Sequence, residues 1–308
     1  MKALITGITG FVGYYLEKQL VDQGIEVFGT SRKVNLGKNI YQLDLLDKSK
    51  IQNILKEIKP THVFHLAGES NVKNSWSNPS KTFEINTIGS ANLLEAVYKV
   101  DNGIRVITIG SSEEYGKVNN LKKITEEMSI NPSNPYGISK AAVGMLINQL
   151  QKGFGMDVIH LRPFNHIGPS QKQGFVTSDF AYQIALFTKG KLINKQMKVG
   201  NLDAVRDFTD VRDIVKAYYL IAIHGRAGEV YNVCSGKGYK IKEILDILLS
   251  FTDKTIEIKI DSQNLRPQDS QFFIGDYKKL EKSTNWNPSI SLTESLNDIY
   301  NYWLNILV

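Results

Sequence analysis

The opening of the sequence constrains the fold most, because a short apolar segment runs directly into a glycine-rich turn. Residues 6–13 are TGITGFVG, which places glycines in a GxxGxxG spacing. A residue without a Cβ lets the backbone approach a pyrophosphate, and the helix start that follows offers free N–H groups and a positive dipole end. Glycines also serve simple tight turns, but the strand–turn–helix context favours a dinucleotide site. The expected contacts are Gly7, Thr9, Gly10, Phe11, Val12 and Gly13.

The first half of the chain alternates short apolar runs with amphipathic stretches. Nearly continuous apolar strands between helices predict a parallel sheet covered on both faces, that is, an α/β fold with a doubly wound Rossmann-type sheet. The expected strands are 2–5, 25–29, 40–43, 62–66, 105–109 and 157–161, and the expected helices are 11–23, 48–58, 81–100 and 136–154.

After Pro163 the pattern becomes irregular and predicts a smaller C-terminal α/β lobe. Helices are expected over 175–189, 211–224, 241–251 and 292–304, with short strands near Lys198, at 230–233 and at 255–260. We expect residues 1–165 to form the cofactor-binding domain, with segments near 200–235 returning to it. Residues 166–308 are expected to form a discontinuous substrate-binding lobe.

Composition narrows the classes of protein. The formal charge of +6 is spread along the chain, which gives no basis for expecting a nucleic-acid partner. No segment approaches the roughly 20 apolar residues of a membrane helix, so no membrane partner is expected. Cys234 is the only cysteine, which excludes an intrachain disulfide or a cysteine-based metal site. We expect a cytoplasmic protein without a bound metal.

The end of the second expected strand bears on the cofactor. NAD-binding units usually carry an acid here for the ribose 2′-hydroxyl, whereas residues 29–33 are GTSRK. Arg32 and Ser31 suit a 2′-phosphate instead, which favours NADP(H) over NAD(H), with use of both left open. Further contacts are expected where ligands bind in open α/β sheets, at the carboxyl ends of the strands: Asp44, Leu45, Leu66, Ala67, Gly68 and Pro163. Asp44 alternatively caps the next helix.

Two segments carry the candidate catalytic residues. In YGISK, Tyr136 and Lys140 stand four residues apart, so on a helix they share one face. A nearby ammonium lowers a phenol pKa and yields an acid/base for carbonyl–alcohol interconversion. In GSSEEYG, which follows the fifth strand, a serine hydroxyl is placed to orient a substrate carbonyl. Serine and glycine also form ordinary turns, but the two segments together favour catalysis.

TGITGFVG, HLAG, SSEEYG and YGISK resemble the extended short-chain dehydrogenase/reductase family over residues 1–170. The resemblance implies that Ser111 orients the carbonyl, that Tyr136 is the acid/base, and that Lys140 binds the nicotinamide ribose. Asn86 matches the family's helix asparagine, for which a relay role and a purely structural role are both open. The resemblance also implies a homodimer through the 81–100 and 136–154 helices.

The second half resembles the members of this family that reduce GDP-linked 4-keto-6-deoxy sugars. The segments are RPFNHIGPSQ, VGN, RDFTDV, VYNVCSG and LRPQD, with Ser170 replacing an expected glycine. The likeness implies reduction of the C4 keto group of GDP-4-dehydro-6-deoxy-D-mannose to GDP-D-rhamnose. The GDP-sugar would contact Ser112, Glu113, Asn165, Val199, Arg206, Arg266 and Asp269. Arginines bind diphosphates bidentately, although Arg206 alternatively pairs with Asp207 or Asp210.

Three other functions remain open at this stage. Glu113 stands where GDP-mannose 4,6-dehydratases of the family carry the glutamate that removes the C5 proton. Hydride delivery to the opposite face of C4 would give GDP-6-deoxy-D-talose. A non-catalytic NADP sensor would retain the glycine turn, but it would have little need for Ser111, Tyr136 and Lys140 together. The reductase is favoured over all three.

Overall fold

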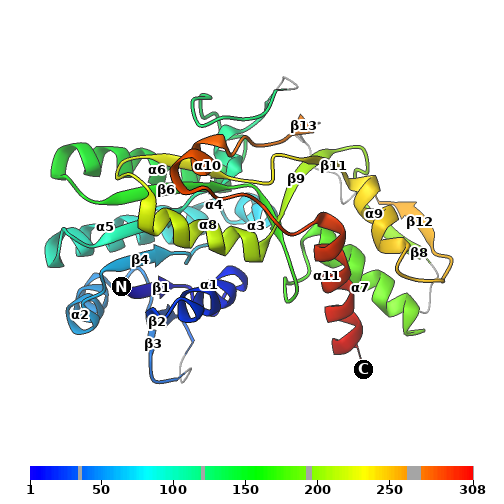
Figure 1. The fold of residues 1–308 in the computed structure, drawn as a ribbon, viewed down its shortest axis with the longest axis horizontal. Coiled ribbons are helices and arrows are strands. Elements are labelled where there is room, and N and C mark those ends of the chain that lie inside the picture. The colour runs from blue at the N-terminus through cyan, green and yellow to red at the C-terminus, as the bar shows by residue number, and fades with distance from the viewer. Residues whose placement is uncertain (34–36, 119–121, 192–195, 262–271, 308) are drawn as a thin grey trace.

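The computed structural model describes residues 1–308 except 34–36, 119–121, 192–195, 262–271 and 308. A seven-stranded sheet runs in the order β10-β6-β5-β4-β1-β2-β3, with every pairing parallel (Figure 1). This order confirms the predicted doubly wound Rossmann-type fold. The strands are β1 (Lys2–Thr6), β2 (Glu26–Ser31), β3 (Ile40–Gln42), β4 (His62–His65), β5 (Arg105–Ile109), β6 (Val158–Pro163) and β10 (Val230–Val233).

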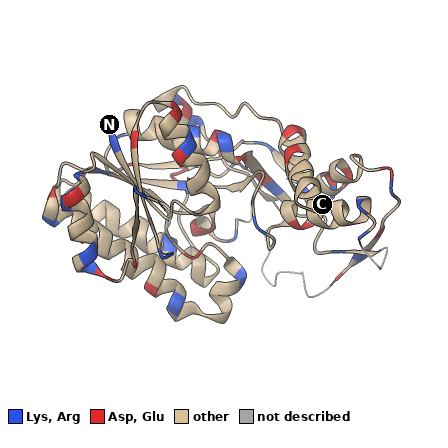
Figure 2. Ribbon diagram, turned by 90° about the horizontal axis from the view of Figure 1, so that it is seen from below, with Lys and Arg blue, Asp and Glu red and all other residues tan. Residues whose placement is uncertain are grey.

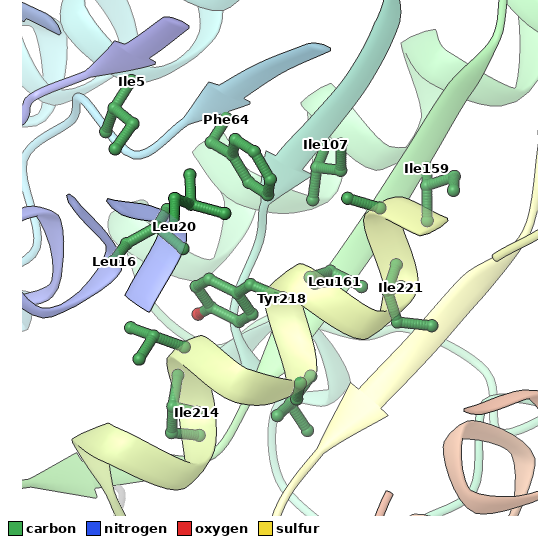
Figure 3. Close-up of a cluster of buried hydrophobic side chains, with 14 of the residues drawn as sticks. Ile5, Leu16, Leu20, Phe64, Ile107, Ile159, Leu161, Ile214, Tyr218 and Ile221 are labelled. Atoms are coloured by element: carbon green, nitrogen blue, oxygen red, sulfur yellow. The ribbon is translucent and has the colours of Figure 1, made fainter. Parts of the chain in front are cut away.

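Helices cover both faces of the sheet because successive strand side chains point to opposite sides. Ile5 packs in one buried cluster with α1 (Phe11–Asp22), α8 (Val211–His224) and α10 (Lys278–Thr284). Leu4 packs on the other face with α2 (Lys48–Ile58), α5 (Gly89–Val100) and α6 (Pro135–Phe154). Figure 3 shows the first cluster, with Tyr218 of α8 lying among Leu16, Leu20, Phe64 and Ile107.

The second lobe lies beyond the carboxyl ends of the strands and has its own core (Figure 1). In it, β9 (Val205–Asp210) pairs with β7 (Asn165–Ile167), β11 (Gly238–Lys240) and β13 (Phe272–Phe273). A second pair joins β8 (Gln196–Val199) to β12 (Glu257–Ile260). Three helices complete the lobe: α7 (Val176–Thr188), α9 (Ile241–Leu249) and α11 (Leu292–Ile306).

Several elements of the structure differ from the prediction, among them the helix expected over 81–100 and the unpredicted strands β7, β9, β11 and β13 and helix α10. The helix expected over 81–100 is preceded by α3 (Val72–Ser77), begins at Pro79 with α4 (Pro79–Phe83), and passes through a π-helical turn (Glu84–Ile88) before α5. Strand β9 was not predicted, because three of its six residues are buried polar groups (Asp207, Thr209 and Asp210) and the strand lacks an apolar alternation.

A buried carboxylate on α8 ties this helix to the segment that precedes α11. Asp213 accepts hydrogen bonds from the Ser289 amide, the Ser289 hydroxyl and the Ile290 amide, each at 2.8 Å. These contacts lie on the α1/α8 side of the sheet. Asp213 therefore fixes the path of the chain on this side of the molecule.

Charged side chains do not gather into one patch on the described surface. Figure 2 shows basic and acidic residues interspersed over both lobes. No helix in the described part of the chain is long and apolar enough to cross a membrane. The same residues contain no group of three or more His, Cys, Asp or Glu side chains suited to a metal ion.

Candidate active site

The glycine turn between β1 and α1 leaves no room for side chains. Gly7 has φ +75°, and a Cβ there would lie 3.0 Å from the backbone N and Cα of Ala67 at the end of β4. A Cβ at Gly13 would lie 2.5 Å from the carbonyl oxygens of Gly7 and Ile8. Gly10 is the N-cap of α1 and supplies no side-chain cap, so the N–H groups of the first helical turn are available to an anion.

The end of β2 places a basic residue beside this turn. Ser31 is buried, and its Oγ lies 3.0 Å from the Thr9 Oγ1 and accepts a hydrogen bond from the Lys33 amide at 3.2 Å. Arg32 is exposed. These hydroxyls and Arg32 thus lie at the end of β2, beside the turn, where the adenosine ribose of a dinucleotide binds in folds of this type.

The remaining predicted cofactor contacts follow the carboxyl edge of the sheet. Leu66, Ala67 and Gly68 come directly after β4, and Pro163 is the last residue of β6. Leu45 is buried, whereas Asp44 is exposed and its Oδ1 accepts from the Leu46 amide at 3.0 Å. The alternative role of Asp44 as a helix cap is wrong, because Asp47 caps α2 by accepting from the Lys50 amide.

Ser111, Tyr136 and Lys140 come together where β5 ends and α6 begins. Ser111 follows β5, and Tyr136 and Lys140 occupy the first turns of α6, which Asn134 caps. Ser111 and Tyr136 are each 8% exposed. The Lys140 Nζ lies 6.0 Å from the centroid of the Tyr136 ring and donates a hydrogen bond to the Ile109 carbonyl at 2.8 Å.

Burial controls the protonation of these groups. It raises the pKa of Tyr136 well above its ordinary value, although the Ser111 side chain lowers it in part. Burial also lowers the pKa of Lys140 to about 8, against a smaller opposing effect of Glu114. The expectation of a lowered pKa for Tyr136 is therefore wrong for this structure, because desolvation of the buried phenol is the largest effect on it. Tyr136 is a protonated phenol at neutral pH.

Sequence reasoning missed a buried cluster directly behind Ser111. Glu114 is fully buried, and its Oε1 lies 2.9 Å from the Ser111 amide nitrogen and 2.9 Å from His160 Nε2. Its Oε2 accepts from Arg162 Nε at 2.7 Å. We call Glu114, His160 and Arg162 the Glu114 cluster. The second glutamate of GSSEEYG suggests an exposed turn, and only the tertiary fold shows that it meets two β6 side chains.

Two other side chains, Asn86 and Asn134, hold α6 in place. Asn86, in the π-helical turn, accepts from the Glu69 amide at 2.7 Å and donates to the Glu69 carbonyl and to Ser139 Oγ. Asn134 accepts from the Gly137 amide and donates to Glu113 Oε2, each at 2.7 Å. Asn86 thus has a structural role in tying the loop after β4 to α6.

The predicted substrate residues spread along the second lobe. Asn165 is exposed and donates to the Asp207 carbonyl at 3.0 Å, while Ser112 is buried beside Ser111. Val199 is 1% exposed, so its side chain belongs to the core of the lobe. Half-buried Arg206 donates to the Val205 carbonyl at 2.8 Å. The predictions for Arg266 and Asp269 lie outside the described residues.

The two carboxylates proposed as alternative partners of Arg206 are engaged elsewhere. Asp207 is buried and accepts from the amides of Ser235, Gly236 and Gly275 and from the Ser235 hydroxyl. Burial raises its pKa to about 6, although these hydrogen bonds lower it in part. Asp210 binds Arg212 and the Ser295 hydroxyl.

Comparison with known proteins gives full-length matches. Residues 4–299 match the family model described as GDP-mannose 4,6 dehydratase. The chain is 35% identical to GDP-6-deoxy-D-mannose reductase of Pseudomonas aeruginosa over 98% of its length and 97% of the relative's. It is 30% identical to GDP-6-deoxy-D-talose 4-dehydrogenase of Aggregatibacter actinomycetemcomitans, covering 91% and 90%. The structure of the Pseudomonas aeruginosa protein RMD complexed with NADPH matches with a TM-score of 0.89, 34% identity and 99% coverage of both chains.

Proposed function

This chain belongs to the GDP-mannose 4,6-dehydratase family of extended short-chain dehydrogenases/reductases, and on that basis we propose that it is an NADPH-dependent 4-keto reductase of a GDP-sugar. The substrate is GDP-4-dehydro-6-deoxy-D-mannose and the product is GDP-D-rhamnose. The observation that carries the proposal is the convergence of Ser111, Tyr136 and Lys140 at the end of β5 in a chain similar throughout to a reductase of this chemistry.

The glycine turn fits a dinucleotide. A Cβ at Gly7 or Gly13 would collide with neighbouring backbone atoms, so these glycines keep the turn compact, and the first-turn N–H groups of α1, which no side chain caps, suit a pyrophosphate. Arg32 supplies a planar cation for a 2′-phosphate, and neither Ser31 nor its neighbours supply a carboxylate for a 2′-hydroxyl. NADP(H) is accordingly the proposed cofactor, with NAD(H) as a weaker alternative.

The chain's own residues position the carbonyl and supply the proton. When bound, the reduced nicotinamide supplies the hydride. Ser111 donates a hydrogen bond that holds the C4 carbonyl, and Tyr136 gives its proton to the oxygen as negative charge develops there. The raised pKa of Tyr136 keeps this proton in place at neutral pH. The Lys140 ammonium, beside the ring, binds the ribose and stabilises the phenolate left after transfer.

Substrate contacts are proposed for the side chains of the second lobe and the η2 turn. Asn165, exposed beside β9, hydrogen-bonds the sugar nucleotide, and Arg206 binds the diphosphate together with Arg266. Ser112 and Glu113 border the sugar. Val199, with its side chain buried, contributes its backbone, and Asp269 recognises the nucleoside.

We also propose a homodimer formed by α5 and α6. Apolar side chains on these two helices stay exposed in the single chain: Tyr98 at 42%, Ile138 at 43%, Met145 at 56% and Phe154 at 52%. The Tyr98 and Phe154 rings pack at 4.8 Å between centroids, so the two helices already share an apolar surface. Burial of such a surface against a second copy stabilises a dimer.

The remaining proposals concern organisation and location. Residues 1–165 form the NADP-binding domain, to which β10 returns by pairing with β6, and residues 166–308 form the substrate lobe. A cytoplasmic location is proposed because the single cysteine, Cys234, is a buried thiol with no disulfide role.

A direct assay tests the function. The purified protein is mixed with NADPH and fresh GDP-4-dehydro-6-deoxy-D-mannose, the nicotinamide absorbance is followed, and the sugar product is identified by NMR. We expect stoichiometric NADPH oxidation and D-rhamnose. Formation of 6-deoxy-D-talose would support the same mechanism but would show that hydride reaches the opposite face of C4. An absence of NADPH oxidation would refute the proposed reductase activity. The protein would then be tested on GDP-mannose as a dehydratase that uses Glu113 as its base.

A further inference from the structure

The Glu114 cluster places a buried charge next to a catalytic residue, and the proposed mechanism does not use it. Both carboxylate oxygens of Glu114 are occupied: Oε1 faces the Ser111 amide and His160 Nε2, and Oε2 faces Arg162 Nε. The Ser111 side chain is also held, because its Oγ accepts a hydrogen bond from the Glu113 amide at 3.1 Å. The main chain and the side chain of Ser111 are therefore fixed from two directions.

The cluster is enclosed on every side. Arg162 NH1 donates to the Tyr115 hydroxyl at 3.1 Å, and the guanidinium lies 4.8 Å from the centroid of the Tyr115 ring. A Cβ at Gly110 would lie 2.1 Å from Glu114 Oε1, and one at Gly144 would lie 3.0 Å from His160 Nε2. Gly110, directly after β5, and Gly144 of α6 thus provide the space that the carboxylate and the imidazole occupy.

The charge on Glu114 needs an explanation, because burying an ionised carboxylate costs several kcal/mol unless it is fully paired. Burial by itself raises the pKa of Glu114, but His160 and Arg162 more than offset this and hold the pKa below its ordinary value. Glu114 is therefore an anion at neutral pH. Hydrogen bonds to an ionised acceptor are stronger than those to a neutral one, so the anion holds the Ser111 amide more firmly than an uncharged side chain would.

We propose that Glu114 is a positioning residue of the reaction: held by Arg162 and His160, it anchors the Ser111 main chain so that the Ser111 hydroxyl faces Tyr136 and the substrate carbonyl. The proposal rests on the proposed function for the role of Ser111. A fixed donor stabilises developing charge without reorganising during the reaction, so loosening Ser111 lowers kcat more than it changes binding. Glu114 itself touches neither the substrate nor the cofactor.

A double-mutant cycle tests this role. The variants are Glu114→Gln, Ser111→Ala and the combination, assayed with NADPH and the 4-keto GDP-sugar. A glutamine offers one acceptor oxygen for three donors, so the anchor is weakened while the volume is kept. We expect Ser111→Ala to lower kcat about 100-fold, Glu114→Gln about 10-fold and the double variant about 100-fold, with both KM values within about 3-fold. A double variant whose loss equals the product of the single losses would overturn the proposal.

The matched control is Asp213→Asn. Asp213 is also a buried carboxylate that accepts main-chain hydrogen bonds, but it lies on α8 between this helix and residues 289–290. We expect this variant to lower the melting temperature while kcat stays at the wild-type value. A kcat loss in Asp213→Asn equal to that in Glu114→Gln would show that general destabilisation explains both effects, and the positioning role would be lost.

Hydrogen exchange provides a measurement that does not depend on activity. The Ser111 amide should exchange faster in Glu114→Gln than in the wild type or in Asp213→Asn. Unchanged exchange would refute the anchor whatever the kinetics show. If the wild type does not reduce the 4-keto sugar, the proposed function fails, while the exchange measurement still decides whether Glu114 holds Ser111. If Glu114→Gln does not fold, Arg162→Lys replaces it in the same experiments. We expect a smaller loss of kcat, again not additive with Ser111→Ala, and a smaller increase in the exchange rate of the Ser111 amide.

Discussion

Two glycines with the same backbone conformation make different contacts, and this difference gives the sharpest test of the cofactor turn. Gly7 has φ +75° and Gly24 has φ +71°. An alanine at either position adopts a left-handed conformation that costs about 1–2 kcal/mol. At Gly24 a Cβ meets nothing within 4 Å, whereas at Gly7 it lies 3.0 Å from the backbone of Ala67, which cannot rotate away. The crowding adds about 1–3 kcal/mol.

Gly24→Ala should therefore lower the free energy of unfolding by about 1–2 kcal/mol and Gly7→Ala by about 2–5 kcal/mol. The two variants should also differ in function. The added methyl group of Gly7→Ala pushes the turn away from Ala67 and displaces the N–H groups that follow. We therefore expect the dissociation constant for NADPH to rise at least about 10-fold, which corresponds to the loss of one well-placed hydrogen bond to a charged group. Gly24→Ala should bind NADPH as the wild type does.

Chemical unfolding followed by circular dichroism measures the stabilities, and calorimetric titration measures NADPH binding. Because both variants carry the same backbone strain, the difference between their free energies of unfolding reports the contact of the added Cβ with Ala67. Equal losses of stability, together with unchanged NADPH affinity in Gly7→Ala, would refute the idea that close approach of this turn to β4 builds the cofactor site.

Four further outcomes are expected. Arg32→Ala should raise the KM for NADPH about 10-fold or more and leave NADH unaffected, as steady-state rates with each cofactor will show. Tyr136→Phe should lower kcat about 10²–10⁴-fold without changing NADPH affinity in titrations. Burial lowers the pKa of Lys140 to about 8, so its ammonium is lost as the pH rises, and kcat/KM for NADPH should decline above about pH 8 with a midpoint there. Met145→Glu should convert the proposed dimer to monomers in light scattering, and a variant that keeps the mass of a dimer would exclude α6 from the interface.

The main sheet could be predicted from the sequence because most of its strands can be recognised from their own residues as short apolar runs. The strands β1, β4 and β5 are short, largely apolar runs, so they appear within a residue or two of their expected positions. Helix α8 begins and ends as predicted, at Val211 and His224, because Asp210 stands at its start and its apolar spacing is regular.

The unpredicted parts depend on contacts between distant residues. Strand β9 is held by pairing with β7, β11 and β13, which come from both sides of it in the sequence. Ser111 and Glu114 form a local capping-box pattern, but this pattern does not predict that Glu114 is buried, because its burial depends on His160 and Arg162, more than 40 residues away on β6. The protonation of Tyr136 likewise depends on burial that the spacing of Tyr136 and Lys140 does not contain.

The composition of the first core has a consequence for synthesis of the chain. Ile5 and Leu16, which emerge early from the ribosome, share a buried cluster with Tyr218 of α8, Leu280 of α10 and Trp286. Until those late residues appear, the part of this face that α8 and α10 cover stays open, and the edge of β6 lacks β10. A nascent chain stalled before residue 210 would expose these apolar side chains to solvent and would depend on chaperones, although every glycine of the turn between β1 and α1 would already be made.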